Sequence, residues 1–279
     1  MGDAQTKVAL VTGASRGIGK ASALKLAEAG FDVAITARTE REGEGRTEAN
    51  SVRGDDPIVT IPGSLETTAK EIEARGQRAF TVRMDLLDPD AVVAAPKAVL
   101  AEWGRIDVLF NNAIFQGGAT MDRLLDLTPD AMERLVRGNY VHQVLLTQQV
   151  LPHMVERGSG RVINMVSGSA RLDPIGPAGE GGWGIGYSAS KAAFGRVAGG
   201  INAEFGPKGV LAFNVDPGNV ITEKRRALRP KDEFEGNFGA ESPEATGAAV
   251  AWLASDEGAS KFLGKWIFAP KLTEDLGLL

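Results

Sequence analysis

Near its amino terminus the chain carries a short apolar run that passes straight into a glycine-rich turn. The run is Val8 to Thr12, and the turn is Gly13-Ala14-Ser15-Arg16-Gly17-Ile18-Gly19. An amphipathic stretch from Ile18 to Ala29 follows, and Gly30 ends it. This order predicts a buried parallel strand, a tight turn and a helix packed close to the strand. Because a helix amino terminus offers N–H groups and partial positive charge, the turn predicts a phosphate site, here for the pyrophosphate of a dinucleotide.

The rest of the chain repeats this alternation of short apolar runs and longer helical patterns. We expect further strands at Asp32–Ala37, Arg78–Met84, Ile106–Phe110, Arg161–Met165, Val210–Val215 and Lys265–Ala269. Helices are expected at Leu65–Arg75, from Asp88-Pro89 onward with a kink at Pro96, at Pro129–Arg157 with a break or bend near Pro152, at Ser188–Phe205 and at Ser242–Ser255. The predicted fold class is α/β, a doubly wound parallel sheet (Rossmann-like) forming a single domain over residues 1–279. Residues 39–63 and 171–186 are expected to be irregular insertions.

Composition narrows the classes of partner. The net charge of −5 and pI near 5.3 argue against nucleic acid or an anionic membrane as the main partner. The chain has no cysteine, which excludes disulfides and thiolate chemistry, and its two histidines, His142 and His153, lie in an apolar helical stretch that favours packing over metal binding. No apolar run is long enough to span a membrane and no signal peptide is seen, so we expect a cytoplasmic protein.

A phenol and an ammonium group lie one helical turn apart at Tyr187 and Lys191. Side chains at this spacing point the same way from a helix. A neighbouring positive charge favours the phenolate, so we expect the pKa of Tyr187 to be lowered and the side chain to exchange a proton with a carbonyl or alcohol oxygen. The alternative is an ordinary amphipathic helix start, but the chain has only two tyrosines and chance placement at this spacing is improbable.

The chain resembles the short-chain dehydrogenase/reductase family at several motifs. They are the glycine-rich turn, the Tyr187–Lys191 pair, Asn111-Asn112-Ala113, Asn139, Ser167 and Asp216-Pro217-Gly218. They occur in the family's order and cover nearly the whole chain. The resemblance implies an oxidoreductase that transfers a hydride between a nicotinamide cofactor and a carbonyl or secondary alcohol. It does not identify the substrate.

The resemblance also implies residue roles. Tyr187 would donate or accept the proton, and Lys191 would lower its pKa and hold the nicotinamide ribose. Ser167 would polarise the substrate oxygen, with Ser169 as a rival for that role. Asn139 would hold a water that links Lys191 to solvent.

The predicted cofactor site gathers residues from the ends of several strands. It comprises Gly13, Ser15, Arg16, Gly17, Ile18, Gly19, Arg38, Asp85, Leu86, Asn112, Ala113, Tyr187, Lys191, Pro217, Gly218, Val220 and Thr222. Arg38 ends the second strand, where an acidic residue would bind an NAD ribose hydroxyl. Because Arg38 can meet a 2′-phosphate instead, with Arg16 on its other side, NADP is preferred over NAD. The alternative is that both arginines are simply solvated.

Three departures from the family's pattern stand out. Ile114 replaces the usual glycine after Asn-Asn-Ala, and the end of the chain lacks the usual Gly-Gly. Ser167 and Tyr187 are 20 positions apart (187 − 167), wider than usual, and the extra piece Arg171–Gly186 carries Trp183. Since loops carry specificity, this piece is expected to be a lid with Trp183 over the reaction centre; a subunit contact or a rigid loop is the alternative.

We expect a homo-oligomer, a tetramer with a dimer as the fallback. The two longest predicted helices carry more apolar residues than one core face needs, and surplus apolar surface marks a partner. Examples are Val144, Leu145, Val150 and Leu151, beside Val141 and Leu146.

Two other functions stay open from the sequence. An epimerase or dehydratase on the same fold would need a sugar-nucleotide site, for which no extra domain is seen. A non-catalytic nucleotide-sensing regulator would keep the glycine turn but would have no need for Tyr187, Lys191, Ser167 and Asn139 together. Apolar residues such as Trp183, Phe115 and Met121 favour an apolar substrate pocket, although core packing would explain them nearly as well.

Overall fold

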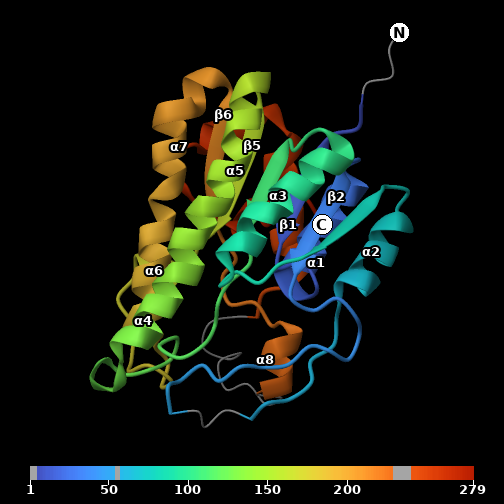
Figure 1. Cartoon of the computed structure of the whole chain (residues 1–279). Helices are drawn as coiled ribbons and strands as arrows, with labels where there is room; N and C mark the ends of the chain where they lie inside the picture. Colours follow the sequence, from blue (N-terminus) through green and yellow to red (C-terminus); the bar gives the residue numbers. More distant parts are fainter. Residues whose placement is uncertain (1–4, 54–56, 229–239) are drawn as a thin grey trace.

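A single parallel sheet organises the chain in the computed structural model, which describes residues 5–53, 57–228 and 240–279. Its seven strands are ordered β3-β2-β1-β4-β5-β6-β7, and every pair is parallel. The strands are β1 Val8–Thr12, β2 Asp32–Ala37, β3 Ala79–Arg83, β4 Val108–Asn111, β5 Gly160–Met165, β6 Val210–Asp216 and β7 Trp266–Phe268. All seven lie where the sequence predicts them, within two residues at each end, and the predicted doubly wound sheet is confirmed (Figure 1).

Helices cover both faces of the sheet (Figure 1). One apolar core lies beneath α1, α2, α10 and α11, and the other beneath α3, α5 and α7. The helices are α1 Gly17–Glu28, α2 Leu65–Glu73, α3 Pro89–Trp103, α4 Pro129–Val136, α5 His142–Arg157, α6 Ile185–Gly195, α7 Val197–Phe205, α8 Glu223–Leu228, α10 Pro243–Ser255 and α11 Ala269–Leu276. Short 3₁₀ turns occupy Leu124–Asp126, Gly168–Ala170, Gly206–Lys208 and Glu257–Phe262.

The long predicted helix over 129–157 is interrupted at a different place from the one expected. α5 runs unbroken through Pro152, and the irregularity is a π-helical turn over Arg137–Val141 that contains Asn139. Such turns often mark functional sites. The helix predicted over 188–205 starts earlier, at Ile185, and divides at Arg196.

Two further helices were not predicted. α8 is only six residues long and strongly charged, so it shows no apolar periodicity. α11 begins at Ala269, where Pro270 occupies the first turn that tolerates proline.

α3 continues through Pro96, which is buried inside the helix.

The predicted insertion at 39–63 is irregular in its described part, and it packs against the body of the protein. An isolated antiparallel bridge joins Arg46 to Thr60, and Thr47 and Ile61 are buried. Its chain crosses the carboxyl edge of the sheet beside α8 (Figure 1). The insertion is therefore more than a surface loop, because its buried residues close one side of that edge.

Most of the apolar residues quoted for the 129–157 helix belong to the chain's own core. Leu146, Val150 and Leu151 are buried in the chain's own core, and Leu145 packs against it. Val141 alone among the quoted residues is exposed, at 47%. Leu146, Val150 and Leu151 lie in the core of the monomer because α5 packs against α3 and against strands β4 and β5.

No helix in the described ranges combines the length and the apolar character needed to cross a membrane.

The amino edge of the sheet is held by one buried carboxylate. Asp107 accepts the N–H of Val8 at 2.8 Å, and its oxygens meet Arg105 at 2.7 Å and Arg157 at 3.0 Å. Burial opposes the charge, but the hydrogen bond from Arg105, the one from the Val8 N–H and the nearby Arg157 charge together lower the pKa of Asp107. The carboxylate thus joins the start of β1 to β4 and to the end of α5.

Replacing Asp107 with Asn should lower the free energy of unfolding by about 2 kcal/mol, the scale of charge-assisted hydrogen bonds. Because the folded pKa of Asp107 is depressed, its contribution is present above the unfolded pKa and lost as pH falls through the folded pKa. Urea unfolding of wild type and Asp107→Asn at neutral and acidic pH would test this. A stability difference that stayed constant down to the lowest pH would contradict the assignment.

Candidate active site

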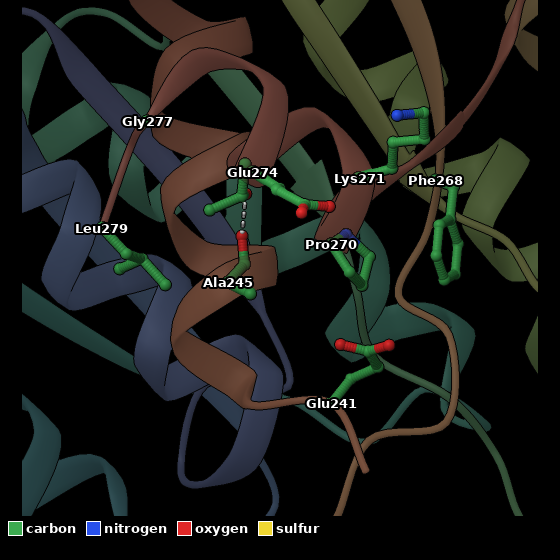
Figure 2. Close-up of a pocket in the computed structure, with 9 residues that line it drawn as sticks. Glu241, Ala245, Phe268, Pro270, Lys271, Glu274, Gly277 and Leu279 are labelled. Carbon is green, nitrogen blue, oxygen red and sulfur yellow. Dashed lines mark hydrogen bonds between the residues drawn. The ribbon is translucent and has the colours of Figure 1, made fainter. Parts of the chain in front are cut away.

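A cavity of about 500 Å³ lies at the carboxyl edge, where β1, β2, β3, β4, β5 and β6 end. Fifteen of the predicted cofactor residues line it: Gly13, Ser15, Arg16, Gly17, Ile18, Gly19, Arg38, Asp85, Leu86, Asn112, Ala113, Tyr187, Lys191, Pro217 and Thr222. The predicted Gly218 and Val220 do not line it. A second cavity of about 580 Å³ lies between α10, α11 and Glu241, and contains none of the predicted residues (Figure 2).

Backbone geometry explains the glycine turn between β1 and α1. Gly13 and Gly17 have φ angles of 68° and 55°, which disfavour side chains. A Cβ on Gly19 would lie 2.2 Å from the Gly13 carbonyl oxygen. The Asn112 amide donates to the Thr12 carbonyl at 2.8 Å and so fixes the turn to the end of β4. The turn therefore keeps the amino terminus of α1 open toward the cavity, as a phosphate site requires.

The two arginines line the cavity but already have partners in this chain. Arg16 donates to the carbonyls of Pro62 at 2.8 Å and Gly63 at 2.6 Å, and burial lowers its pKa. Arg38 forms an ion pair with Glu48. Sequence reasoning missed Glu48 because it lies in an irregular segment without a pattern. The arginines are thus held by the insertion, not freely solvated.

Tyr187 and Lys191 project from α6 and are both buried. The Lys191 ammonium donates to the Met165 carbonyl, at the end of β5, at 2.8 Å. Burial raises the pKa of Tyr187 to about 12 and lowers the pKa of Lys191 to about 8. The expectation of a lowered Tyr187 pKa is therefore wrong for this structure. Loss of hydration outweighs the other influences on the phenolate, and no effect of Lys191 is resolved.

Ser167 and Ser169 are neighbours in one small hydrogen-bond network. Ser167 follows β5 and caps the 3₁₀ turn, accepting the Ser169 N–H at 3.3 Å and the Ser169 hydroxyl at 3.0 Å. A side-chain hydrogen bond with Ser167 lowers the pKa of Tyr187, against the effect of burial. Ser167 is thus the serine next to the phenol, and Ser169 supports it.

Asn139 lies in the π turn between α4 and α5. Its side chain is fully buried, accepts the Phe115 N–H at 2.8 Å and donates to the Phe115 carbonyl at 3.1 Å. The amide also donates to the Ser190 hydroxyl of α6 at 3.4 Å, so it joins the segment after β4 to the helix that carries Lys191. It anchors the segment after β4, which carries Ile114 and forms one wall of the cavity.

The extra piece before α6 lies against the predicted catalytic residue. The Trp183 ring stacks on the Tyr187 ring with 4.9 Å between centroids and 30° between planes, and Trp183 stays 44% exposed. The Gly184 N–H donates to the Thr120 carbonyl at 3.1 Å, and Glu180 pairs with Arg123. Trp183 thus packs on the phenol ring, and contacts with Thr120 and Arg123 join its segment to the body of the protein.

The two hydrogen bonds between the Asn139 side chain and the Phe115 main chain can be tested against a matched control. Asn139→Ala leaves the Phe115 N–H and carbonyl unpaired and should cost about 2 kcal/mol of stability. Asn202 makes the same reciprocal contact with Ala212, at 2.7 and 2.8 Å, and lies away from the cavity. Urea unfolding should show similar losses for Asn139→Ala and Asn202→Ala, whereas a turnover assay should show a loss only for Asn139→Ala. Equal turnover in the two variants would remove Asn139 from the site.

Comparisons with known proteins agree with this geometry. The sequence model of the family described as short chain dehydrogenase matches residues 7–63 and 58–233. A 3-oxoacyl-[acyl-carrier-protein] reductase of Staphylococcus aureus is 30% identical over 90% of this chain and 92% of its own length. A 2-dehydro-3-deoxy-D-gluconate 5-dehydrogenase of Pseudoalteromonas atlantica is 31% identical over 90% of this chain and 89% of its own.

Two solved structures share the whole fold. A metagenomic short-chain oxidoreductase in complex with NADP is 29% identical, with a TM-score of 0.67 over 91% of this chain and 93% of that one. An acetoin dehydrogenase of Enterobacter cloacae is 28% identical, with a TM-score of 0.74 over 95% and 94%. With the fold, the glycine turn and the Tyr187–Lys191 pair at one edge of the sheet, the chain belongs to the short-chain dehydrogenase/reductase family of oxidoreductases.

Proposed function

We propose that this protein is an NADP(H)-dependent oxidoreductase that transfers a hydride between nicotinamide and a carbonyl or secondary alcohol. The observation that carries the proposal is the shared cavity. Tyr187 and Lys191 line the same cavity as the glycine turn. A dinucleotide with its pyrophosphate at α1 could therefore reach the phenol with its other end.

The nicotinamide supplies or accepts the hydride, and the protein handles the proton. Tyr187 is the general acid in carbonyl reduction, where its O–H is donated to the oxygen that becomes the alcohol. With a pKa of about 12, Tyr187 is protonated at neutral pH, which suits the donating direction. In alcohol oxidation the phenolate would have to form first. Ser167 holds the substrate oxygen beside the phenol.

The cofactor preference rests on Arg16 and Arg38, which line the cavity beyond the glycine turn. A 2′-phosphate there would meet Arg38 bidentately. Glu48 already pairs with Arg38, so the phosphate would have to displace or share that carboxylate's contact. A related solved structure holds NADP, which supports the same choice here.

The substrate is proposed to be a small molecule with an apolar group beside its reacting carbon. Trp183 stacks on Tyr187 and Phe115 lines the cavity, so aromatic surface flanks the phenol.

We also propose a cytoplasmic location and a homo-oligomer, either a tetramer or a dimer. The support for an oligomer now rests on exposed apolar residues of the π turn and α4, Val141, Val136 and Met132. Epimerase and regulator functions are not favoured by any feature of the cavity.

The role of Tyr187 is tested by Tyr187→Phe, which removes the hydroxyl and keeps the ring. We expect carbonyl reduction by NADPH to fall at least 100-fold, the scale of general acid catalysis. NADPH binding, measured by nucleotide fluorescence, should change little, since the ring still stacks on Trp183. Near-normal turnover by Tyr187→Phe would exclude Tyr187 as the proton donor.

The preference for NADP over NAD is tested by substituting each partner of the Arg38–Glu48 ion pair in turn. Arg38→Asp should weaken NADPH binding by more than about tenfold, the scale of a lost charge-assisted contact. Glu48→Gln, which removes the competing carboxylate and frees Arg38, should strengthen it. NADH binding serves as the control and should respond less to both. A wild-type protein that prefers NADH would refute the argument from Arg16 and Arg38.

A further inference from the structure

Asp216 is a buried carboxylate that the proposed reaction does not yet use. It is the last residue of β6, and only 9% of its surface is exposed. One oxygen accepts the Gly218 N–H at 3.1 Å, and the other lies 3.2 Å from the position that a Cβ on Gly168 would take. Within the described ranges no basic side chain forms an ion pair with it.

Strand register places Asp216 on the face of the sheet that α6 covers, at the level of Lys191. Lys191 donates to the carbonyl of Met165, and Met165 pairs across the sheet with Val215, the residue before Asp216. Successive side chains of a strand alternate between faces, so Asp216 shares a face with Asn214. Asn214 donates to the Gly195 carbonyl of α6 at 2.6 Å, which identifies this face as the one that α6 covers.

The two elements run in opposite directions at this point. Gly195 lies level with Asn214, and Lys191 is four residues earlier in α6, a rise of about 6 Å. Asp216 is two residues further along β6, an advance of about 6.6 Å. The carboxylate of Asp216 and the ammonium of Lys191 therefore stand at the same height between strand and helix.

We propose that Asp216 is a positioning residue that keeps Lys191 as an ammonium ion beside Tyr187 in the buried site. Among the described residues the Lys191 ammonium has one hydrogen-bond partner, the Met165 carbonyl, which carries no counter-charge. Burial of an uncompensated charge is costly. Asp216 supplies the counter-charge from the neighbouring strand. The inference rests on the proposed function in one respect, namely that Lys191 serves the hydride-transfer site.

The charges around the pair are consistent with this role. Asp216 raises the pKa of Lys191 against the lowering by burial, and is the one charged side chain with that effect in the described structure. It also raises the pKa of Tyr187. The other ionisable groups nearby are Arg171, stacked over Trp266 of β7, and Glu241, beside Gly218. Asp216 thus favours the charged lysine and the protonated tyrosine together, which is the pairing that carbonyl reduction needs.

The direct experiment is a titration of Lys191 in protein labelled with carbon-13 at the lysine side chains. Lys191→Met identifies the resonance. In wild type the resonance should titrate near pH 8, the pKa of Lys191. Asp216→Asn keeps the shape and removes the charge, so the midpoint should fall by roughly one pH unit, the scale of one nearby charge. Asp130→Asn, an exposed site on α4, changes the net charge equally and should leave the midpoint unchanged.

The second measurement is the pH dependence of kcat/KM for carbonyl reduction. The alkaline loss of kcat/KM for carbonyl reduction should move to lower pH in Asp216→Asn by the same interval as the Lys191 midpoint. Circular dichroism checks that the variant is folded. If it is not, Asp216→Ser, whose hydroxyl can still accept the Gly218 N–H, takes its place.

The outcomes separate this inference from the proposed function. An unchanged Lys191 midpoint in a folded variant that lacks the carboxylate would overturn the role of Asp216, even if the wild type reduces carbonyls. A lowered midpoint in a protein that reduces no carbonyl would support the role of Asp216 and refute the proposed function.

Discussion

Parallel pairing of β1, β4, β5 and β6 is the constraint on which the site depends. Because parallel strands end together, the glycine turn after β1, Asn112 after β4, Ser167 after β5 and Pro217 after β6 meet at one edge. None of these residues is near another in sequence. The helices that follow the strands then supply an amino terminus at α1 and a buried acid–base pair at α6, which is the arrangement that binds ligands in open α/β sheets.

The two insertions meet over that edge through one short segment. Asp122 accepts N–H groups from Val52, in the first insertion, at 2.9 Å and from Ala119 at 2.6 Å. The Thr120 carbonyl accepts the Gly184 N–H of the second insertion. The two insertions are therefore joined to each other through residues 119–122. Ala119 has a φ of 71°, a strained conformation for a side-chain-bearing residue, which these contacts hold in place.

Sequence patterns predicted the fold, and fifteen of the predicted cofactor residues line one cavity, because strands and the glycine turn are local signals. The contacts between distant segments were not predictable. The π turn at Asn139 depends on the main chain of Phe115, and the ion pair of Arg38 with Glu48 depends on the path of an irregular insertion. The raised pKa of Tyr187 follows from burial, which a four-residue spacing does not encode. The short helix α8 carries no apolar period from which it could be recognised.

Isotope transfer tests the central claim most directly. NADPH carrying deuterium at the reactive nicotinamide carbon would be incubated with the wild-type protein and a panel of small apolar ketones and aldehydes, and the products examined by mass spectrometry. If nicotinamide is the hydride donor, one deuterium appears on the carbon that bears the new hydroxyl group. We also expect the hydroxyl proton to come from solvent through Tyr187. Oxidation of NADPH without deuterium in any product alcohol, or the absence of turnover across the panel, would contradict the proposed hydride transfer.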